Sequence, residues 1–322
     1  MEEPPPGRAR RARVVMAGTA IAVIGILYLG RAWWGAEAGN YQRDVNMFKP
    51  PAAETKLENG RRLIIQAQGQ DRDWSNYVKM EEVIPDHNHL MHLFIFSVPG
   101  MERMWHLHPE RIAGGAFEEE LPTMPAGEYQ IFADIVDKDG FPWTLVGHAA
   151  LPQLHGRALT GDDSSWSEAR SPTGTGDRAV SELADGGRIV WRRDGVLQAN
   201  TSISFRFSVE DKDGKPARDI EPYMGMAGHA EFVSRDMTVF AHVHPAGSVS
   251  MAALELARTE PAGASGEMQV GGATMAMPIA GAPWPAEVSF PYGFPHPGEY
   301  RIFVQIKRAG QIETGVFDAH VE

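Results

Sequence analysis

The chain contains no cysteine, and this absence removes several kinds of chemistry at once. Its 322 residues cannot form disulfide bonds, thiolate metal sites or cysteine nucleophiles. The sequence also lacks the Gly-x-Ser-x-Gly elbow of serine hydrolases, the His-Glu-x-x-His zinc motif and a phosphate-binding glycine loop. An enzyme is therefore the weakest functional interpretation, and we expect no catalytic residues.

Positive charge is also scarce. The chain has 30 basic and 42 acidic residues, which gives a formal net charge of -12. Such a balance disfavours nucleic acid as a partner. A hydrophobic content of 43% with 22% charged residues is typical of globular proteins, and the length suffices for two domains.

Only one long apolar run is present, and it lies near the N-terminus. Residues 14–30 carry no charge, four arginines precede them, and Trp33 and Trp34 follow. About 17 residues is short for a membrane helix and long for a signal-peptide core, so a cleaved signal remains the alternative. The arginines and tryptophans favour an uncleaved anchor. We predict a basic cytoplasmic N-terminus (1–13), a transmembrane anchor (14–34) and a periplasmic remainder, in a single-pass protein of the inner (cytoplasmic) membrane.

The remainder is typical of an all-β protein. Short apolar runs alternate with turn signals, and the 34 glycines and 23 prolines suit many turns. We predict an extended arm (35–59), a first β-sandwich (60–155), a flexible linker rich in Ser, Gly and Asp (156–186) and a second β-sandwich (187–322). The expected fold is thus two tandem immunoglobulin-like sandwiches after one N-terminal transmembrane helix.

Smaller elements are also predicted within this frame. Residues 71–76 are expected to form a loop, and residues 250–257 a short helix. The sequence Gly-Glu-Tyr occurs twice, at Tyr129 and Tyr300, before an alternating strand. This is the pattern of a tyrosine corner, but we interpret both tyrosines as packing residues.

Histidines recur in the same arrangement in both halves. His92 precedes His106-Leu-His108, and His229 precedes His242-Val-His244. Residues two apart in a strand point to the same side, and cross-strand neighbours lie about 5 Å apart at Cβ. One hairpin in each half would therefore gather three imidazoles, an arrangement that suits zinc or copper. The alternative is a set of hydrogen-bonded histidines with no metal.

Methionines near these histidines favour copper over zinc. Met224 and Met226 come just before His229, and thioether with imidazole in the absence of thiolate favours Cu(I). The candidate metal ligands are therefore His229, His242, His244, Met224, Met226, His92, His106 and His108, with copper as first choice, zinc as second, and no bound metal as the alternative. His87 and His89 occur only in the first copy, whose site they would extend.

The second half also resembles a known family. Glu221-Pro-Tyr-Met-Gly-Met-Ala-Gly-His229, Phe240-Ala-His-Val-His-Pro245 and Phe290-Pro-Tyr-Gly-Phe-Pro resemble exported bacterial YtkA-like proteins. This resemblance implies an immunoglobulin-type β-sandwich and suggests metal binding. The first half shares only its His-x-His-Pro and Gly-Glu-Tyr pieces and lacks the Glu-Pro-Tyr-Met-Gly-Met segment.

Three functional hypotheses follow. The first is a non-catalytic, membrane-anchored accessory or scaffold subunit of a larger membrane complex, such as a respiratory or photosynthetic one, with a His-rich metal site as an added feature. Its partners would be other subunits and, through one helix, the lipid bilayer. The second is a periplasmic copper-binding or copper-handling protein. A His-metal hydrolase is the third and weakest.

Overall fold

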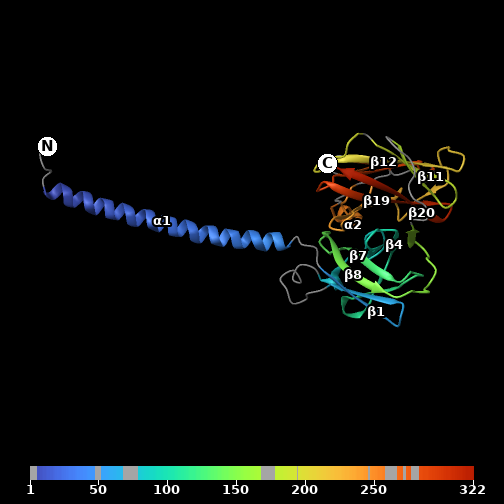
Figure 1. Ribbon diagram of the computed structural model, residues 1–322, viewed down its shortest axis with the longest axis horizontal. Helices are drawn as coiled ribbons and strands as arrows, with labels where there is room; N and C mark the ends of the chain where they lie inside the picture. Colours follow the sequence, from blue (N-terminus) through green and yellow to red (C-terminus); the bar gives the residue numbers. More distant parts are fainter. Residues whose placement is uncertain are drawn as a thin grey trace. The chain divides into compact units, whose positions relative to one another are not determined.

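The structure, a computed structural model, describes residues 6–47, 52–67, 79–167, 178–193, 195–245, 247–257, 267–270, 273–276 and 283–322. The chain divides into two compact units, Met1–Lys49 and Pro50–Glu322. The first is helical and the second is almost entirely β-structure (Figure 1). The predicted fold class, all-β after one N-terminal helix, is confirmed.

Helix α1 spans Pro6–Met47. Its segment Arg10–Gly39 is 30 residues long with a mean hydropathy of 2.0, and its most apolar window is 0% buried. At 1.5 Å per residue this segment measures about 45 Å, more than the roughly 30 Å of a bilayer core. By length and composition it can cross a membrane.

The helix also corrects the extended arm predicted over residues 35–59. It continues to Met47, and strand β1 already begins at Ala53. Residues 35–47 include Ala, Glu, Gln and Arg, which favour helix, and they contain no proline. The next proline in the chain is Pro50. The aromatic pair Trp33–Trp34 therefore lies within the helix and is exposed there.

The first sandwich consists of a four-stranded sheet in the order β1-β2-β6-β5 and a five-stranded sheet in the order β8-β7-β3-β4-β9. Two short 3-10 helices, η2 (Met80–Glu82) and η3 (Ala113–Gly115), accompany them. The strands are β1 Ala53–Glu58, β2 Arg62–Ala67, β3 His92–Ser97, β4 Arg103–Leu107, β5 Glu110–Arg111, β6 Phe117–Glu120, β7 Gly127–Val136, β8 Pro142–Leu151 and β9 Ser164–Ser167.

The second sandwich repeats this plan. One sheet has the order β10-β11-β12-β18, and the other has the order β13-β19-β14-β15 with β20 paired to β19. Helix α2 (Met251–Ala257) confirms the predicted short helix. The strands are β10 Arg178–Glu182, β11 Arg188–Arg192, β12 Ile203–Glu210, β13 Ile220–Glu221, β14 His229–Ser234, β15 Phe240–Val243, β16 Glu267–Val270, β17 Ala273–Ala276, β18 Glu287–Tyr292, β19 Gly298–Arg308 and β20 Gln311–Val321, of which β16 and β17 form a separate hairpin.

Two of these strands lie inside the segment predicted as a linker, 156–186. Strand β9 pairs with β4 and so completes a sheet of the first sandwich, while β10 pairs with β11 of the second. Trp166 of β9 is buried in an apolar cluster, and this burial keeps the strand in place although the surrounding sequence is rich in Ser and Asp. Residues 168–177 and the predicted loop at 71–76 lie outside the described residues.

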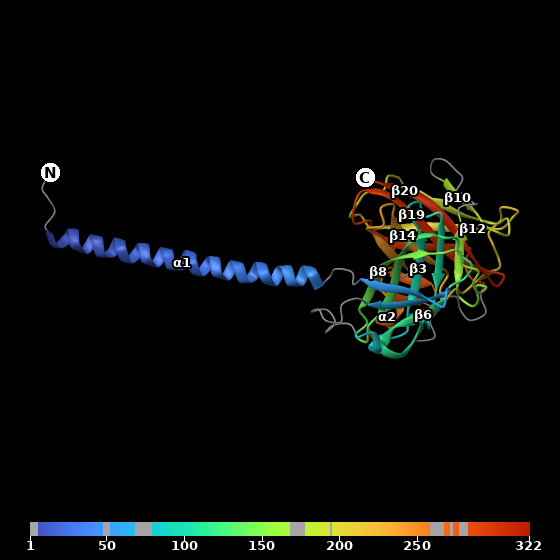
Figure 2. The same cartoon turned by 60° about the horizontal axis from the view of Figure 1, so that its bottom comes forward.

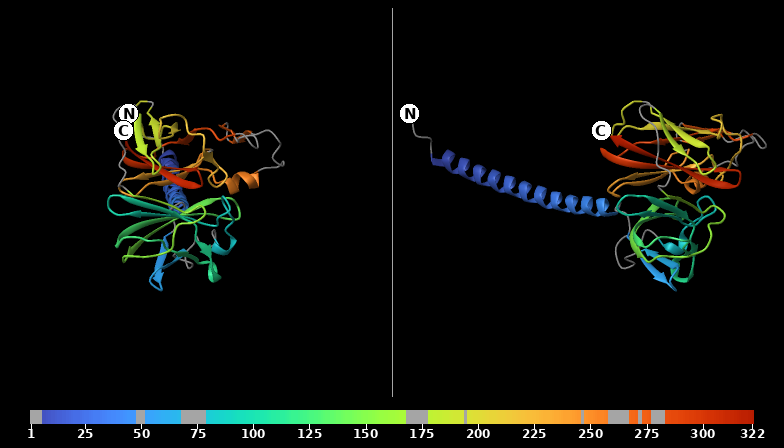
Figure 3. Two further views of the ribbon diagram at one scale, coloured as in Figure 1. Left: turned by 90° about the vertical axis from the view of Figure 1, so that its right-hand side faces the viewer. Right: turned by 45° about the vertical axis from the view of Figure 1, so that its right-hand side comes forward.

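The five-stranded sheets of the two sandwiches face each other (Figures 2 and 3). Strands β3 and β14 are buried at all six positions, because both of their faces are covered. In β3, Leu93 and Ile95 pack into the core of the first sandwich, while Phe94 and Phe96 point to the other side. There they join an apolar interface cluster that contains residues of both sandwiches. The first sandwich contributes Phe94, Phe96, Met101, Met104, Phe132 and Trp166, and the second contributes Val233, Phe303 and Val316.

Tyr129 and Tyr300 do more than pack, which corrects our interpretation of them. The Tyr129 hydroxyl donates to the carbonyl of Pro125 at 2.7 Å, and that of Tyr300 to His296 at 2.9 Å. Each acceptor lies four residues upstream, as in the tyrosine corner of immunoglobulin-like sandwiches. The two copies therefore share this bond as well as their strand order.

Candidate metal centre

The two hairpins place the predicted histidines as expected. In the first, Leu93 pairs with Leu107, so His92 lies beside His108, with ring centroids 5.1 Å apart. In the second, Ala230 pairs with Val243, and the rings of His229 and His244 are 5.2 Å apart. The hairpin geometry predicted from the His-x-His spacing is confirmed.

Both hairpins deliver their histidines to the same place, the interface between the sandwiches. His92 of the first lies 5.4 Å from His242 of the second, centroid to centroid. The sequence predicted one site per half, whereas the structure forms a single His-rich centre. Its eight imidazoles come from His87, His89, His92, His106, His108, His229, His242 and His244.

Within this centre, His92, His106 and His108 form what we call the first trio. One ring nitrogen from each lies within 4.8 Å of the others. Nδ1 of His92 and Nε2 of His106 are 3.1 Å apart. Two imidazole nitrogens bound at about 2.0–2.1 Å to one tetrahedral zinc would be roughly 3.3 Å apart, so the spacing suits shared ligation.

The second trio differs from the predicted one. It comprises His87, His229 and His244, again with one nitrogen each within 4.8 Å, and does not include His242. His87 was expected to extend the first site, but it belongs here. His87 and Asn88 have φ values of 50° and 70°, so the chain turns sharply and carries the His87 ring to within 4.9 Å of the His229 ring. The second trio therefore draws ligands from both sandwiches.

In the first trio, hydrogen bonds fix which nitrogen carries the proton. His92 Nε2 lies 3.1 Å from the Asp86 carbonyl and His108 Nδ1 lies 3.0 Å from an Asp163 oxygen, so both must donate. His106 Nδ1 lies 2.8 Å from Oε1 of Gln305 and donates to it. In neutral rings, the remaining nitrogens carry lone pairs. Lone pairs of His92 and His106 therefore face each other, and Nε2 of His108 has no hydrogen-bond partner among the described residues.

The second trio follows the same logic. His87 Nδ1 donates to the carbonyl of Met224 at 3.0 Å, and His244 Nδ1 to that of Val249 at 3.2 Å. Their Nε2 atoms, each with a lone pair, are 3.2 Å apart. His229 is fully buried, and neither of its ring nitrogens has a hydrogen-bond partner in the described part of the chain. Facing lone pairs and an unpartnered buried ring are unfavourable without a cation between them.

Burial keeps these rings neutral. It lowers the pKa of His92, His106, His229 and His244 well below the ordinary value of 6.5, and neighbouring histidines lower each further. The pKa of His87 and of His108 is also lowered, mainly by burial. Neutral imidazole is the form that binds metals, so the trios are prepared for ligation at neutral pH.

Carboxylates support the first trio from outside. Arg157 Nη2 donates to Asp163 at 2.6 Å and to Glu119 at 2.7 Å. Burial alone would raise the pKa of Asp163, but the hydrogen bonds from His108 and Arg157 lower it below its ordinary value. Burial raises the pKa of Glu119 to about 7. Carboxylate–histidine pairs of this kind orient metal ligands in proteins.

His242 and Glu231 lie beside the trios. The His242 ring is 4.6 Å from that of His244 and 5.3 Å from that of His229. Glu231 pairs with His242 in the hairpin register, is fully buried, and has no hydrogen-bond partner on either carboxylate oxygen within the described residues. Burial raises its pKa well above the ordinary value, and the charge of Asp134 adds to this. Burial therefore favours the neutral form of the Glu231 carboxyl group, which lies at the edge of the centre.

Met224 and Met226 are buried in the turn that begins at Tyr223. Met224 contributes its carbonyl oxygen, which accepts the hydrogen bond from His87. A thioether role for either methionine remains a prediction.

The supporting residues were missed by sequence reasoning. Gln305 and Tyr223 come from the second sandwich and contact His106 of the first. Asp163 lies in Gly161-Asp-Asp-Ser164, a run whose composition indicated a linker. In strand β19, Val304 and Ile306 point into the core of the second sandwich, so the alternation of the strand places Gln305 on the opposite face. This alternation is the feature of the sequence that indicated the direction of the Gln305 side chain.

Comparison with known proteins identifies one family model. A domain of unknown function, DUF8832, matches residues 182–322, which contain the second sandwich from the last residue of β10 onwards. A search of curated proteins finds no match.

Several solved structures are similar over most of the chain, with low scores. The fibronectin(III)-like modules of Clostridium thermocellum CbhA are 12% identical, with coverage of 84% of this chain and 90% of theirs, at a TM-score of 0.16. A chimeric titin Z1Z2 is 8% identical, with 85% and 99% coverage and a TM-score of 0.16. A Bacteroides ovatus glucan-utilisation protein, SGBP-B, is 9% identical, with 85% and 67% coverage and a TM-score of 0.17.

Proposed function

We propose that this protein is a membrane-anchored metal-binding protein whose two sandwiches bind transition-metal ions between them, one ion in each trio. The observation that carries the proposal is the pair of facing lone pairs in each trio, at 3.1 Å and 3.2 Å. Each of these four nitrogens belongs to a ring whose other nitrogen donates to an oxygen. Hydrogen-bonded core histidines would instead direct donors towards acceptors.

Copper is the first choice of metal and zinc the second. Imidazole suits both ions, and the chain has no thiolate. Met224 and Met226 lie next to the second trio in sequence and favour Cu(I). The three-nitrogen sets leave room for a further ligand, as in sites that exchange their metal.

The apolar helix supports an anchored location. In this proposal Arg10–Gly39 spans the inner membrane with the arginine-rich end in the cytoplasm, and the metal centre faces the periplasm. The resemblance of the second sandwich to YtkA-like exported proteins agrees with this placement.

Metal content tests the proposal. The full chain, purified in mild detergent, is saturated with Cu(I) or Zn(II), desalted, and analysed for metal per chain. We expect about two ions for the parent protein, one for His106→Ala, one for His229→Ala and none for the double variant. His320→Ala is the matched control, because its ring is exposed and pairs with Glu299. A parent chain that retains no metal would refute the proposal.

A second candidate function is an accessory subunit of a larger membrane complex. The apolar window of α1 supports it, because a helix that crosses the membrane offers an apolar surface to the helices of other subunits. Purification from the native membrane would then yield the chain with other subunits in fixed ratio. Purification alone, with metal bound, would exclude this candidate and leave the first.

A further inference from the structure

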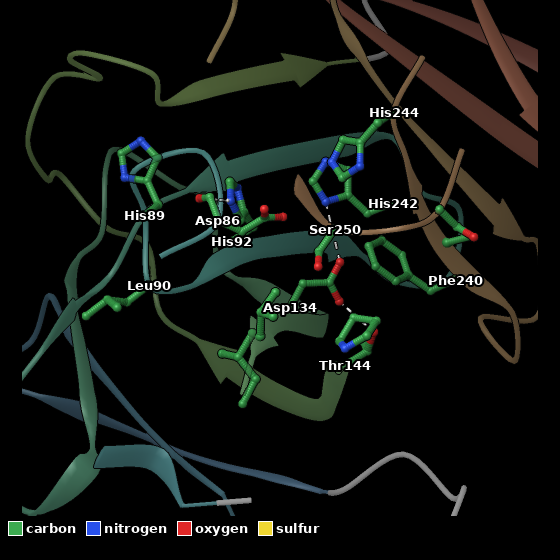
Figure 4. A pocket seen from close by; sticks show the side chains of 15 residues that line it. Asp86, His89, Leu90, His92, Asp134, Thr144, Phe240, His242, His244 and Ser250 are labelled. Carbon is green, nitrogen blue, oxygen red and sulfur yellow. Dashed lines mark hydrogen bonds and ion pairs between the residues drawn. The ribbon is translucent and has the colours of Figure 1, made fainter. Parts of the chain in front are cut away.

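A pocket of about 200 Å³ leads from the surface to the histidines (Figure 4). This is several times the roughly 30 Å³ that a water molecule occupies in the liquid, so the pocket has room for a hydrated ion. His92 of the first trio and His244 of the second both line it, together with His242, Asp134 and His89. One pocket thus reaches both trios.

Exposure decreases along the pocket. The side chains of His89 and Asp134 are 26% and 21% exposed and that of His242 is 5% exposed, while His92 and His244, the trio members that line the pocket, are 2% and 3% exposed. An ion entering from outside would therefore meet Asp134 and His89 before the trios. Asp134 is held in place by Thr144, whose hydroxyl donates to it at 2.5 Å.

His242 stands between this entrance and both trios. Its Nδ1 lies 3.5 Å from an Asp134 oxygen, while its Nε2 is buried without a hydrogen-bond partner among the described residues. Its ring lies 5.4 Å and 5.8 Å from His92 and His106, and 4.6 Å and 5.3 Å from His244 and His229. His92 and His106 belong to the first trio, and His244 and His229 belong to the second.

We propose that His242 is the exchange ligand of the centre, which takes a metal ion from the pocket and passes it to either trio. This inference rests on the proposed function, since it assumes that the trios bind metal. The ion exchanges water for Asp134 and His242, and then exchanges these for the trio nitrogens. Only metal–ligand bonds form and break, and the oxidation state of the ion does not change.

The experiment compares the rate of metal uptake with the amount bound at equilibrium. Full-length protein in detergent receives Cu(I) from a coloured Cu(I)–chelator complex, and the colour change is followed by stopped flow. For His242→Gln we expect the same two ions per chain with uptake about tenfold slower, which matches the lower end of the loss in metal affinity or activity caused by altering residues that support metal ligands. Asp134→Asn should also slow uptake, and His320→Gln should leave it unchanged.

The outcomes separate this inference from the proposed function. Uptake by His242→Gln at the parent rate would overturn the inference and leave metal binding intact. Loss of one ion per chain in that variant would also overturn it, because His242 would then be a permanent ligand. A parent chain that binds no Cu(I) would overturn both proposals.

Discussion

At the residue scale, the centre depends on hydrogen bonds that fix the tautomer of five of its histidines, namely His87, His92, His106, His108 and His244. Carbonyl, amide and carboxylate oxygens accept from the outer nitrogens, so the inner nitrogens stay unprotonated. The same oxygens set the ring orientations. Residues that never contact an ion therefore decide whether one can bind.

Protonation of the centre predicts how stability depends on pH. Because folding lowers the pKa of six histidines below 6.5, the unfolded chain takes up more protons than the folded one as pH falls below about 6.5. The free energy of unfolding should fall by about 1.4 kcal/mol per pH unit for each such proton. Folding raises the pKa of Glu119 to about 7, which acts in the opposite direction between pH 4.5 and about 7, and it also raises the pKa of Glu231; these are two groups against six.

Urea unfolding of the metal-free protein in chelator, at pH 7.5 and 5.5, measures this effect. We expect the lower midpoint at pH 5.5. Equal midpoints would show that the buried histidines do not titrate differently in the two states.

The tyrosine corners give a second prediction at this scale. Tyr129→Phe and Tyr300→Phe each remove one partly buried hydrogen bond and should each lower the free energy of unfolding by about 1 kcal/mol. Tyr292→Phe is the control, as no hydrogen bond joins its hydroxyl to the described residues; it should change stability by less than about 0.5 kcal/mol. Equilibrium denaturation in urea distinguishes these values.

At the element scale, the hairpins were predictable and their surroundings were not. The His-x-His spacing and the short turns fixed which rings lie opposite each other, because a strand alternates its faces. Strand β3 contains the continuous apolar run Leu93–Phe96, and β14 contains a mixed run with Glu231 in its middle; neither sequence tells what covers the second face of its strand. The position of His87 in the second trio depends on positive φ values in one turn. Histidine and asparagine adopt positive φ more often than most non-glycine residues, but this tendency does not tell where the turn carries the His87 ring.

The doubly covered strands predict a large cost for truncation at the interface. Phe303 of β19 is fully buried, and its ring lies 5.3 Å from Phe96 and 5.6 Å from Trp166 of the first sandwich. Phe303→Ala should lower the free energy of unfolding by about 3–5 kcal/mol. Phe141→Ala, at a ring that is 45% exposed, should cost far less. Similar losses in both variants would mean that the sandwiches are not packed through this surface.

At the scale of the whole molecule, the proposed metal binding would be linked to the docking of the two sandwiches. The second trio takes His87 from the first sandwich and His229 and His244 from the second, so an ion bound there can only be held while the two are docked. Free metal at 100 times its Kd should raise the free energy of unfolding by about 2.7 kcal/mol.

Hydrogen exchange of the β-unit with and without Cu(I) tests this link. We expect slower exchange in both β3 and β14 when Cu(I) is present, and no change in the His106→Ala/His229→Ala double variant. Protection confined to one sandwich would contradict a shared ion.

The two sandwiches present equivalent sheets to each other, in the orders β8-β7-β3-β4 and β20-β19-β14-β15. A surface that meets its own counterpart in this way is the contact of a homodimer, here contained in one polypeptide. Covalent joining fixes the local concentration of the halves and frees each to diverge. His87 illustrates that freedom: only the first half has a histidine at this position, and it completes the second trio, an asymmetry that two identical subunits could not have.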